Sequence, residues 1–253
     1  MTGAAKDLHS GRHGGSAPNP IAALSALLAS MHGPDGRVSV DGFLDDAPPP
    51  DPRILTAIDA SNFDSAAYYR EIGVAGGDPI DTGRELLIRQ WLEPTLEFNG
   101  IWGGYQGKGT KTVIPNTAGA KITCRLVAGQ KPDNVIAAIT RHLQKHLTKG
   151  FQLDVHRHGP GSEADFVDPD LPALKISEEV LGELLGQTPL RVAMGATIPI
   201  GSAFRRHLGC AAIFFSFSTA DEDYHAPNEF FRLSNFKLGM RAWTMLLRRL
   251  AAA

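Results

Sequence analysis

The chain has 253 residues, 43% of them hydrophobic, and a formal net charge of −2 at pH 7. This apolar content is enough for the core of one large domain or two ordinary ones. The near-neutral charge provides no basic field that would attract nucleic acid or anionic lipid. No stretch approaches the roughly 18 apolar residues of a membrane span, and residues 1–20 lack the apolar core of a signal peptide. We therefore expect a cytoplasmic protein without nucleic-acid or membrane partners.

The two cysteines, Cys124 and Cys210, are far apart in the sequence. The first lies in a run of alternating polar and apolar residues, and the second precedes an apolar run. We expect two buried free thiols rather than a disulfide, as is usual in the cytosol.

The first part of the chain begins with a loop and a short helix. Residues 7–15 are rich in glycine, and Asn19 and Pro20 then provide the cap and the first residue of a helix with regularly spaced apolar side chains. Residues 35–95 are rich in Asp, Pro and Gly, which indicates an insertion. Short helical patches are predicted within it around 63–72 and 83–91.

Strand-like runs return at 95–101 and 118–127. In the second run polar and apolar side chains alternate, which is typical of a half-exposed sheet. Lys121, Thr123 and Arg125 are expected on one face, and Ile122, Cys124 and Leu126 on the other. A helix is then predicted from Pro132 to Gly150, with one apolar stripe, followed by a strand at 151–155.

After Gly159 longer helices alternate with continuous apolar runs. Helices are predicted at 173–185, 201–208 and 234–250, and strands at 190–198 and 211–217. Strands without polar positions are typical of a sheet that is covered on both faces. The sequence therefore predicts an α/β protein of two domains with a boundary near 158. The first would be an α+β sheet with helices on one face, and the second part of a helix–sheet sandwich.

Two histidine pairs have spacings that can bind a metal. His142 and His146 are four residues apart on the predicted helix, and His156 and His158 share one face of a strand end. No further ligand lies near either pair, so solvated histidines are the favoured interpretation of both. The glycine-rich loops contain neither a Gly-x-Ser-x-Gly elbow nor a phosphate-binding loop, which argues against a serine hydrolase or a nucleotide-binding protein.

The loop at 218–229 follows the most apolar predicted strand, at the position where α/β folds place their active sites. It carries His225 among several carboxylates. Nearby negative charge opposes the neutral, metal-binding form of an imidazole unless a cation is present, so this acidity is consistent with a metal. An acidic loop that caps the next helix is the alternative.

Five motifs occur in an order that matches one family. They are Asp7-Leu-His-Ser-Gly with Gly14-Gly15, Gly100-Ile-Trp-Gly-Gly-Tyr with Gly109-Thr-Lys-Thr-Val-Ile-Pro, Lys121-Ile-Thr-Cys-Arg-Leu-Val, Gly195-Ala-Thr-Ile-Pro and His225-Ala-Pro-Asn-Glu. Together they resemble the C-terminal part of the carnosinase-type dipeptidases in metallopeptidase family 20. This family includes aminoacylases, glutamate carboxypeptidases and succinyl-diaminopimelate desuccinylases.

The resemblance implies a metal-dependent hydrolase of dipeptides or N-acyl amino acids with two zinc ions, or other divalent metals. His225 matches a zinc ligand, and His9 matches a lid histidine that reaches across a homodimer to stabilise the oxyanion. Arg125 matches an arginine that holds the substrate carboxylate, a task suited to a planar guanidinium. Thr112 and Thr197 match hydroxyl positions in the same pocket. Without the resemblance, these five would be ordinary strand, turn and loop residues.

The same resemblance implies a fold. Residues 1–158 would form a dimerisation lid with a ferredoxin-like sheet, and residues 159–253 the second half of an α/β/α zinc-peptidase catalytic domain. The sequence departs from the family pattern where Ala193 replaces an arginine and Ala196 a glycine.

The family's remaining metal ligands and its general base lie in motifs that do not precede Asp7. A catalytic zinc needs about three protein ligands, so we expect an N-terminally truncated chain that is inactive alone. Two other interpretations stay open: a non-enzymatic dimerisation or binding module derived from the family, and an unrelated ferredoxin-like binding domain.

Overall fold

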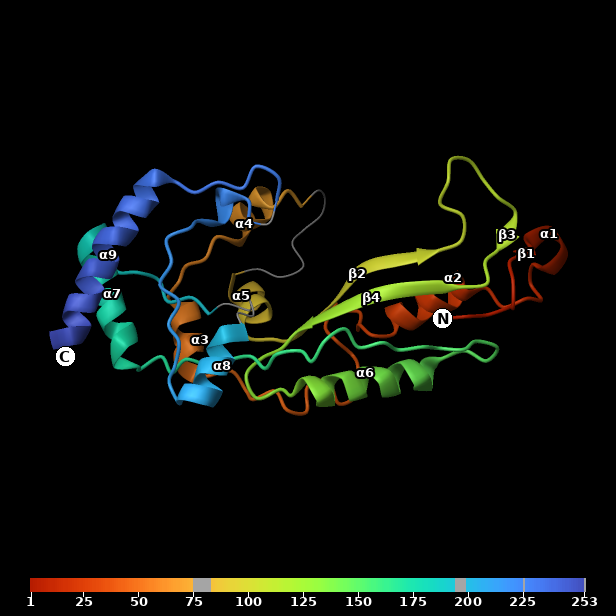
Figure 1. The fold of residues 1–253 in the computed structure, drawn as a ribbon, viewed down its shortest axis with the longest axis horizontal. Helices are drawn as coiled ribbons and strands as arrows, with labels where there is room; N and C mark the ends of the chain where they lie inside the picture. The colour runs from red at the N-terminus through yellow and green to blue at the C-terminus, as the bar shows by residue number, and fades with distance from the viewer. Residues whose placement is uncertain (75–82, 194–198, 225, 253) are drawn as a thin grey trace. The chain divides into compact units, whose positions relative to one another are not determined.

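The computed structural model describes residues 1–74, 83–193, 199–224 and 226–252. Figure 1 shows its elements, which follow one another as β1 (Leu8–His9), α1 (Ser10–His13), α2 (Pro20–Ala29), α3 (Pro52–Asp59), α4 (Ser65–Glu71), α5 (Gly83–Trp91), β2 (Thr95–Gly103), β3 (Val113–Ile114), β4 (Ala118–Arg125), α6 (Pro132–His146), α7 (Pro172–Leu185), α8 (Pro199–Leu208), the 3₁₀ helix η1 (Ala220–Glu222) and α9 (Leu233–Ala252).

The chain forms two compact units. The first consists mainly of Met1–Pro49 and Ile88–Ala164, and the second of Pro50–Leu87, Asp165–Ala193 and Ile200–Ala253. Residues 50–87, which precede the predicted boundary near 158, therefore cluster with the later part of the chain. The boundary itself stays a prediction.

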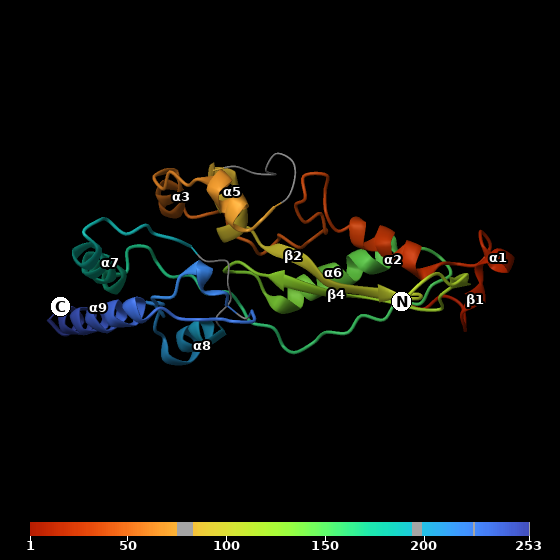
Figure 2. The ribbon, with the colours of Figure 1, turned by 90° about the horizontal axis from the view of Figure 1, so that it is seen from above.

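The first unit is a small antiparallel sheet with helices on one face. β2 pairs with β4, from Thr95 opposite Arg125 to Gly103 opposite Ala118. Figure 2 shows α2 and α6 running along this sheet. Their apolar side chains form the core together with Leu96 of β2. The predicted alternation is confirmed, because Ile122 and Cys124 pack against this core whereas the polar side chains between them are exposed.

Local signals explain where the helices of this unit begin. The side chain of Asn19 accepts hydrogen bonds from the N–H groups of Ile21 and Ala22, and Pro20 occupies the first helical position of α2. Pro132 has the same position in α6. That helix ends at His146, earlier than the predicted Gly150.

The second unit is mostly helical. α7 packs against α9 through Val180, Ala242 and Leu246. Arg249 of α9 also forms ion pairs with Glu179 and Glu183 of α7. The helices predicted at 173–185, 201–208 and 234–250 are confirmed as α7, α8 and α9. The helix α3 was not predicted, although Asp51 caps it and Pro52 begins it.

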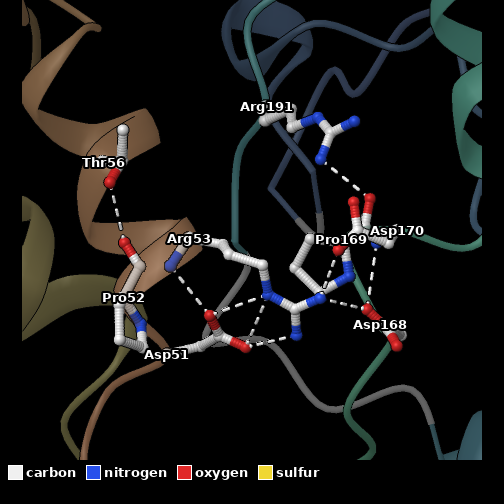
Figure 3. A network of polar contacts seen from close by, with 8 residues as sticks. All are labelled: Asp51, Pro52, Arg53, Thr56, Asp168, Pro169, Asp170 and Arg191. Carbon is white, nitrogen blue, oxygen red and sulfur yellow. Dashed lines mark hydrogen bonds and ion pairs between the residues drawn. The ribbon is translucent and has the colours of Figure 1, made fainter.

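One arginine connects α3 with the segment that precedes α7 (Figure 3). The guanidinium of Arg53 donates to Asp51 at 2.7 Å, to Asp168 at 2.7 Å and to Asp170 at 2.6 Å. These hydrogen bonds hold the pKa of Asp51 and that of Asp170 below the usual range. Three carboxylates that would repel one another are thereby held around one cation.

Three predicted strands differ in the structure. Residues 151–155 contribute only an isolated bridge, between Gln152 and Thr2. The run at 211–217 forms no ladder with any described segment, and neither does the described part of 190–198, residues 190–193. An apolar run becomes a strand only where a neighbouring backbone accepts and donates its hydrogen bonds, and the described residues provide no such neighbour here.

Candidate functional site

The structure brings together two of the predicted site residues, His9 and Thr112. β1 pairs antiparallel with β3, with His9 opposite Val113. The N–H of Ser10 donates to the carbonyl of Thr112 at 3.1 Å. As a result, Nε2 of His9 lies 3.5 Å from Oγ1 of Thr112, on an exposed surface. An imidazole and a hydroxyl so placed can both donate hydrogen bonds to an oxyanion of a bound molecule.

The backbone around this pair is fixed by its sequence neighbours. Asp7 accepts a hydrogen bond from the N–H of Asn116 at 2.9 Å through Oδ1. The N–H of Gly3 donates to the carbonyl of Asn116 at 2.8 Å. The chain before His9 is therefore tied to the chain after Thr112 through Asn116.

Arg125 lies at the other end of the sheet. It is the last residue of β4, opposite Thr95, and it is exposed on the polar face as predicted. Figure 1 shows β1 and β3 beyond the end of β4 that begins at Ala118. Eight residues of β4, at about 3.3 Å each, separate the two ends by more than about 20 Å. One small substrate therefore cannot contact both Arg125 and His9 of the same chain.

The other two predicted site residues, Thr197 and His225, lie outside the described residues. Across the described ranges 1–74, 83–193, 199–224 and 226–252, no group of three His, Cys, Asp or Glu side chains could hold a metal ion. The side chains in these described ranges thus do not by themselves fit a zinc site.

The histidine pairs have different surroundings. His156 is exposed and lies 3.7 Å from Asp154. His142 was predicted to be solvated, which is wrong: it is only 5% exposed and stacks on His146 at 4.3 Å between ring centroids. Because the hydroxyl of Ser30 donates to the carbonyl of Leu27, Nε2 of His142 donates to that hydroxyl, at 2.9 Å. Burial, and then His146, lower the pKa of His142.

Two carboxylates of the acidic loop, those of Asp221 and Glu222, form hydrogen bonds that stabilise the loop. Glu222 is fully buried, and its Oε2 accepts from the N–H of Thr219 at 3.1 Å. Its Oε1 accepts from the N–H of Arg232 at 3.0 Å. The guanidinium of Arg232 also donates to Asp221 at 2.6 Å, which lowers the pKa of that carboxyl to about 2. Hydrogen bonds within the loop and to Arg232 therefore account for Asp221 and Glu222 without a metal.

Sequence reasoning missed this arrangement, although part of it was visible. Thr219 and Glu222 have the spacing of a capping box, in which a glutamate reaches back to the N–H of the cap residue. Arg232 lies ten residues further on, and no local pattern connects it to Glu222.

The two cysteines, Cys124 and Cys210, differ in their exposure. Both are free. Cys124 is partly buried, and burial, followed by the charge of Glu97, raises the pKa of its thiol to about 11. Cys210 is exposed, so the prediction that it is buried is wrong.

With this geometry in place, comparison with known proteins identifies the chain. A model of the peptidase dimerisation domain matches residues 1–150. The chain belongs to this family. The match covers the sheet, α2, α6 and the His9–Thr112 pair, and it supports the resemblance to carnosinase-type dipeptidases that the motifs predicted.

The curated relatives of this member of the peptidase dimerisation family include dipeptidases. The Cys-Gly metallodipeptidase dug1 of Schizosaccharomyces pombe is 27% identical over 259 residues, which is 100% of the chain and 53% of that protein. The Beta-Ala-His dipeptidase of Homo sapiens is 27% identical over 248 residues, which is 97% of the chain and 49% of that protein. The chain thus spans about half the length of these relatives.

Solved structures of the family have the same fold. The M20 family metallo-carboxypeptidase Sso-CP2 from Sulfolobus solfataricus superposes with a TM-score of 0.85 at 25% identity, covering 98% of the chain and 56% of that protein. Human carnosine dipeptidase 1 superposes with a TM-score of 0.80 at 27% identity, covering 98% of the chain and 52% of that protein. None of the helices in the described part of the chain is long and apolar enough to cross a membrane.

Proposed function

We propose that the chain is the lid and the second catalytic half of a metal-dependent hydrolase of dipeptides or N-acyl amino acids. The observation that carries this proposal is the separation of the site residues into two sets. His9 and Thr112 lie together at one end of the lid, and Arg125 lies more than about 20 Å away at the other. A dimer in which each site takes one set from each chain reconciles this separation with a small substrate.

In this arrangement each residue has a task that suits its chemistry. The exposed guanidinium of Arg125 binds the carboxylate of a substrate in its own chain's site, with two parallel N–H donors. His9 of the partner chain donates from its imidazole to the oxyanion that forms during attack, and Thr112 orients that imidazole and adds a second donor. The curated relatives are named for Cys-Gly and Beta-Ala-His, dipeptides with a free carboxylate.

The metal part of the proposal depends on residues beyond the described set. We infer that His225 is one ligand of a zinc pair, or of another divalent metal, and that Thr197 lines the substrate pocket. The remaining ligands and the general base would come from the half of the relatives' length that the chain does not span. A bound zinc pair would supply an activated water and polarise the scissile carbonyl.

The partner is a second copy of the chain, joined through the lid. Within the described residues β2 pairs with no strand except β4, so its outer edge can accept another strand. The carbonyl of Leu96 is not available, because it lies 3.0 Å from Nε2 of His32. The match to a peptidase dimerisation domain over residues 1–150 supports this choice of partner.

The test is a mixed-dimer experiment with two variants, His9→Ala and Arg125→Ala. Each variant is produced together with a second polypeptide that corresponds to the part of the relatives that the chain does not span. Dipeptide hydrolysis is then measured for each variant alone and for an equal mixture of the two after subunit exchange. If His9 acts across the dimer, a mixed dimer has one site with both residues intact. Random exchange makes about half of the dimers mixed, so the mixture should regain about a quarter of the wild-type rate.

The outcome separates the alternatives. If both single variants are inactive and a mixture that has exchanged subunits shows no recovery, His9 does not act across the dimer. If both single variants keep full activity, neither residue has the proposed role. A wild-type assembly that dimerises but neither binds zinc nor hydrolyses any dipeptide would favour a non-enzymatic dimerisation module.

A further inference from the structure

The imidazole of His9 lies directly against the backbone of Gly11. A Cβ atom added to Gly11 would lie 2.9 Å from Cε1 of His9 and 3.2 Å from Nδ1. Ordinary van der Waals contacts of a Cβ begin near 3.4 Å. The ring therefore occupies space that only a glycine at position 11 leaves open.

The neighbouring ring atom Nε2, which is bonded to Cε1, faces Thr112, whose Oγ1 lies 3.5 Å away. The backbone at both ends is held by the β1–β3 ladder and by the hydrogen bond from Ser10 to Thr112. The imidazole is thus close both to the backbone of Gly11 and to the hydroxyl of Thr112. The orientation of the ring therefore depends mainly on steric contact with Gly11, because the hydrogen bond described for the ring, to Thr112, is long.

We propose that Gly11 is a positioning residue for His9, and that it acts through the absence of a side chain. The catalytic part of this inference rests on the function proposed above, whereas the contact itself does not. An added methyl group at position 11 must displace the ring, because an imidazole at the end of a rotatable side chain yields more easily than backbone. The displacement turns Nε2 away from the position where an oxyanion would meet it.

The substitution Gly11→Ala separates positioning from folding. Gly11 lies inside α1 and its φ is not positive, so alanine fits the backbone there and favours a helix. Thermal stability should therefore be unchanged or slightly higher. The matched control is Gly182→Ala in α7, where the added methyl would meet nothing closer than 3.7 Å.

The first measurement uses the chain alone. In a ¹H–¹³C NMR spectrum, the His9 Cε1–H signal is the one that disappears in His9→Ala. We expect this signal to shift in Gly11→Ala and to stay in place in Gly182→Ala. An unshifted signal in Gly11→Ala would overturn the contact.

The second measurement is kcat for dipeptide hydrolysis in the assembly that contains the remaining length of the relatives. A misplacement approaching 1 Å lowers kcat by roughly 10- to 100-fold, and KM should change little because the carboxylate is held by Arg125. If His9→Ala lowers kcat and Gly11→Ala does not, the positioning role is wrong. If His9→Ala itself has no effect, the proposed function of His9 fails, while the NMR result still decides whether Gly11 fixes the ring.

Discussion

The buried carboxylate of Glu222 provides the sharpest test of the forces that shape the acidic loop. The substitution Glu222→Gln keeps the shape of the side chain but replaces one acceptor oxygen by an NH₂ donor. Both oxygens are used, one by the N–H of Thr219 at 3.1 Å and the other by the N–H of Arg232 at 3.0 Å. Either orientation of the glutamine therefore sets an NH₂ group against one backbone donor.

The magnitude follows from that one lost bond. A buried donor left without an acceptor costs about 1–3 kcal/mol. The guanidinium of Arg232 keeps its hydrogen bonds to Asp221 and Thr219, so it adds little to the loss. We expect the closed loop to be destabilised by about 2 kcal/mol. This free energy corresponds to an open-loop population that is about 30-fold larger.

The assay is amide hydrogen exchange at Thr219 and Arg232, whose N–H groups donate to the carboxylate of Glu222. Phe230, whose N–H donates to the backbone carbonyl of Glu222, reports on the same loop. The control is Asp223→Asn, which removes the same charge one residue away. Asp223 is exposed and has a positive φ of 51°, a conformation that asparagine tolerates. If exchange in Glu222→Gln is no faster than in the control, the carboxylate does not close this loop.

Three further predictions concern titration and reactivity. The ion pair of Asp221 with Arg232 stabilises the fold at pH values above 3.8, the ordinary pKa of Asp, and this contribution is lost as the pH falls through about 2. Arg232→Gln should return the NMR titration midpoint of Asp221 toward 3.8. Because burial raises the pKa of Cys124 to about 11, iodoacetamide at neutral pH should label the exposed Cys210 first, and equal rates would contradict this. Burial lowers the pKa of His142, so its contribution to stability is present above about pH 6.5 and lost in acid; urea unfolding of His142→Gln should depend less on pH between 7 and 5 than that of the wild type.

Much of the first unit could be predicted from local patterns. The alternation in 118–127 set which side of β4 faces the helices, and Asn19 with Pro20 set the start of α2. These features depend on neighbours within a few residues, so the sequence contains their cause. The ordered motifs also indicated the family that the comparison of residues 1–150 confirms.

The apolar runs show where local patterns fail. Residues 211–217 have the composition of a buried strand, yet Phe214 is 54% exposed and the run pairs with no described segment. Composition expresses a preference for burial, but a strand also requires a partner backbone that another part of the polypeptide must supply. Likewise, the buried His142 forms its hydrogen bond with Ser30, 112 residues away.

The sequence by itself determined most of the longer helices and the polar face of the lid sheet, because each depends on residue types at short spacing. It also contained the motifs of the family. Only the tertiary structure decided that His9 meets Thr112 while Arg125 lies at the far end of the sheet. Only it revealed that Glu222 and Arg232 close the acidic loop. These relations join residues far apart in the chain, and their distances are set by strand register and packing rather than by any local preference.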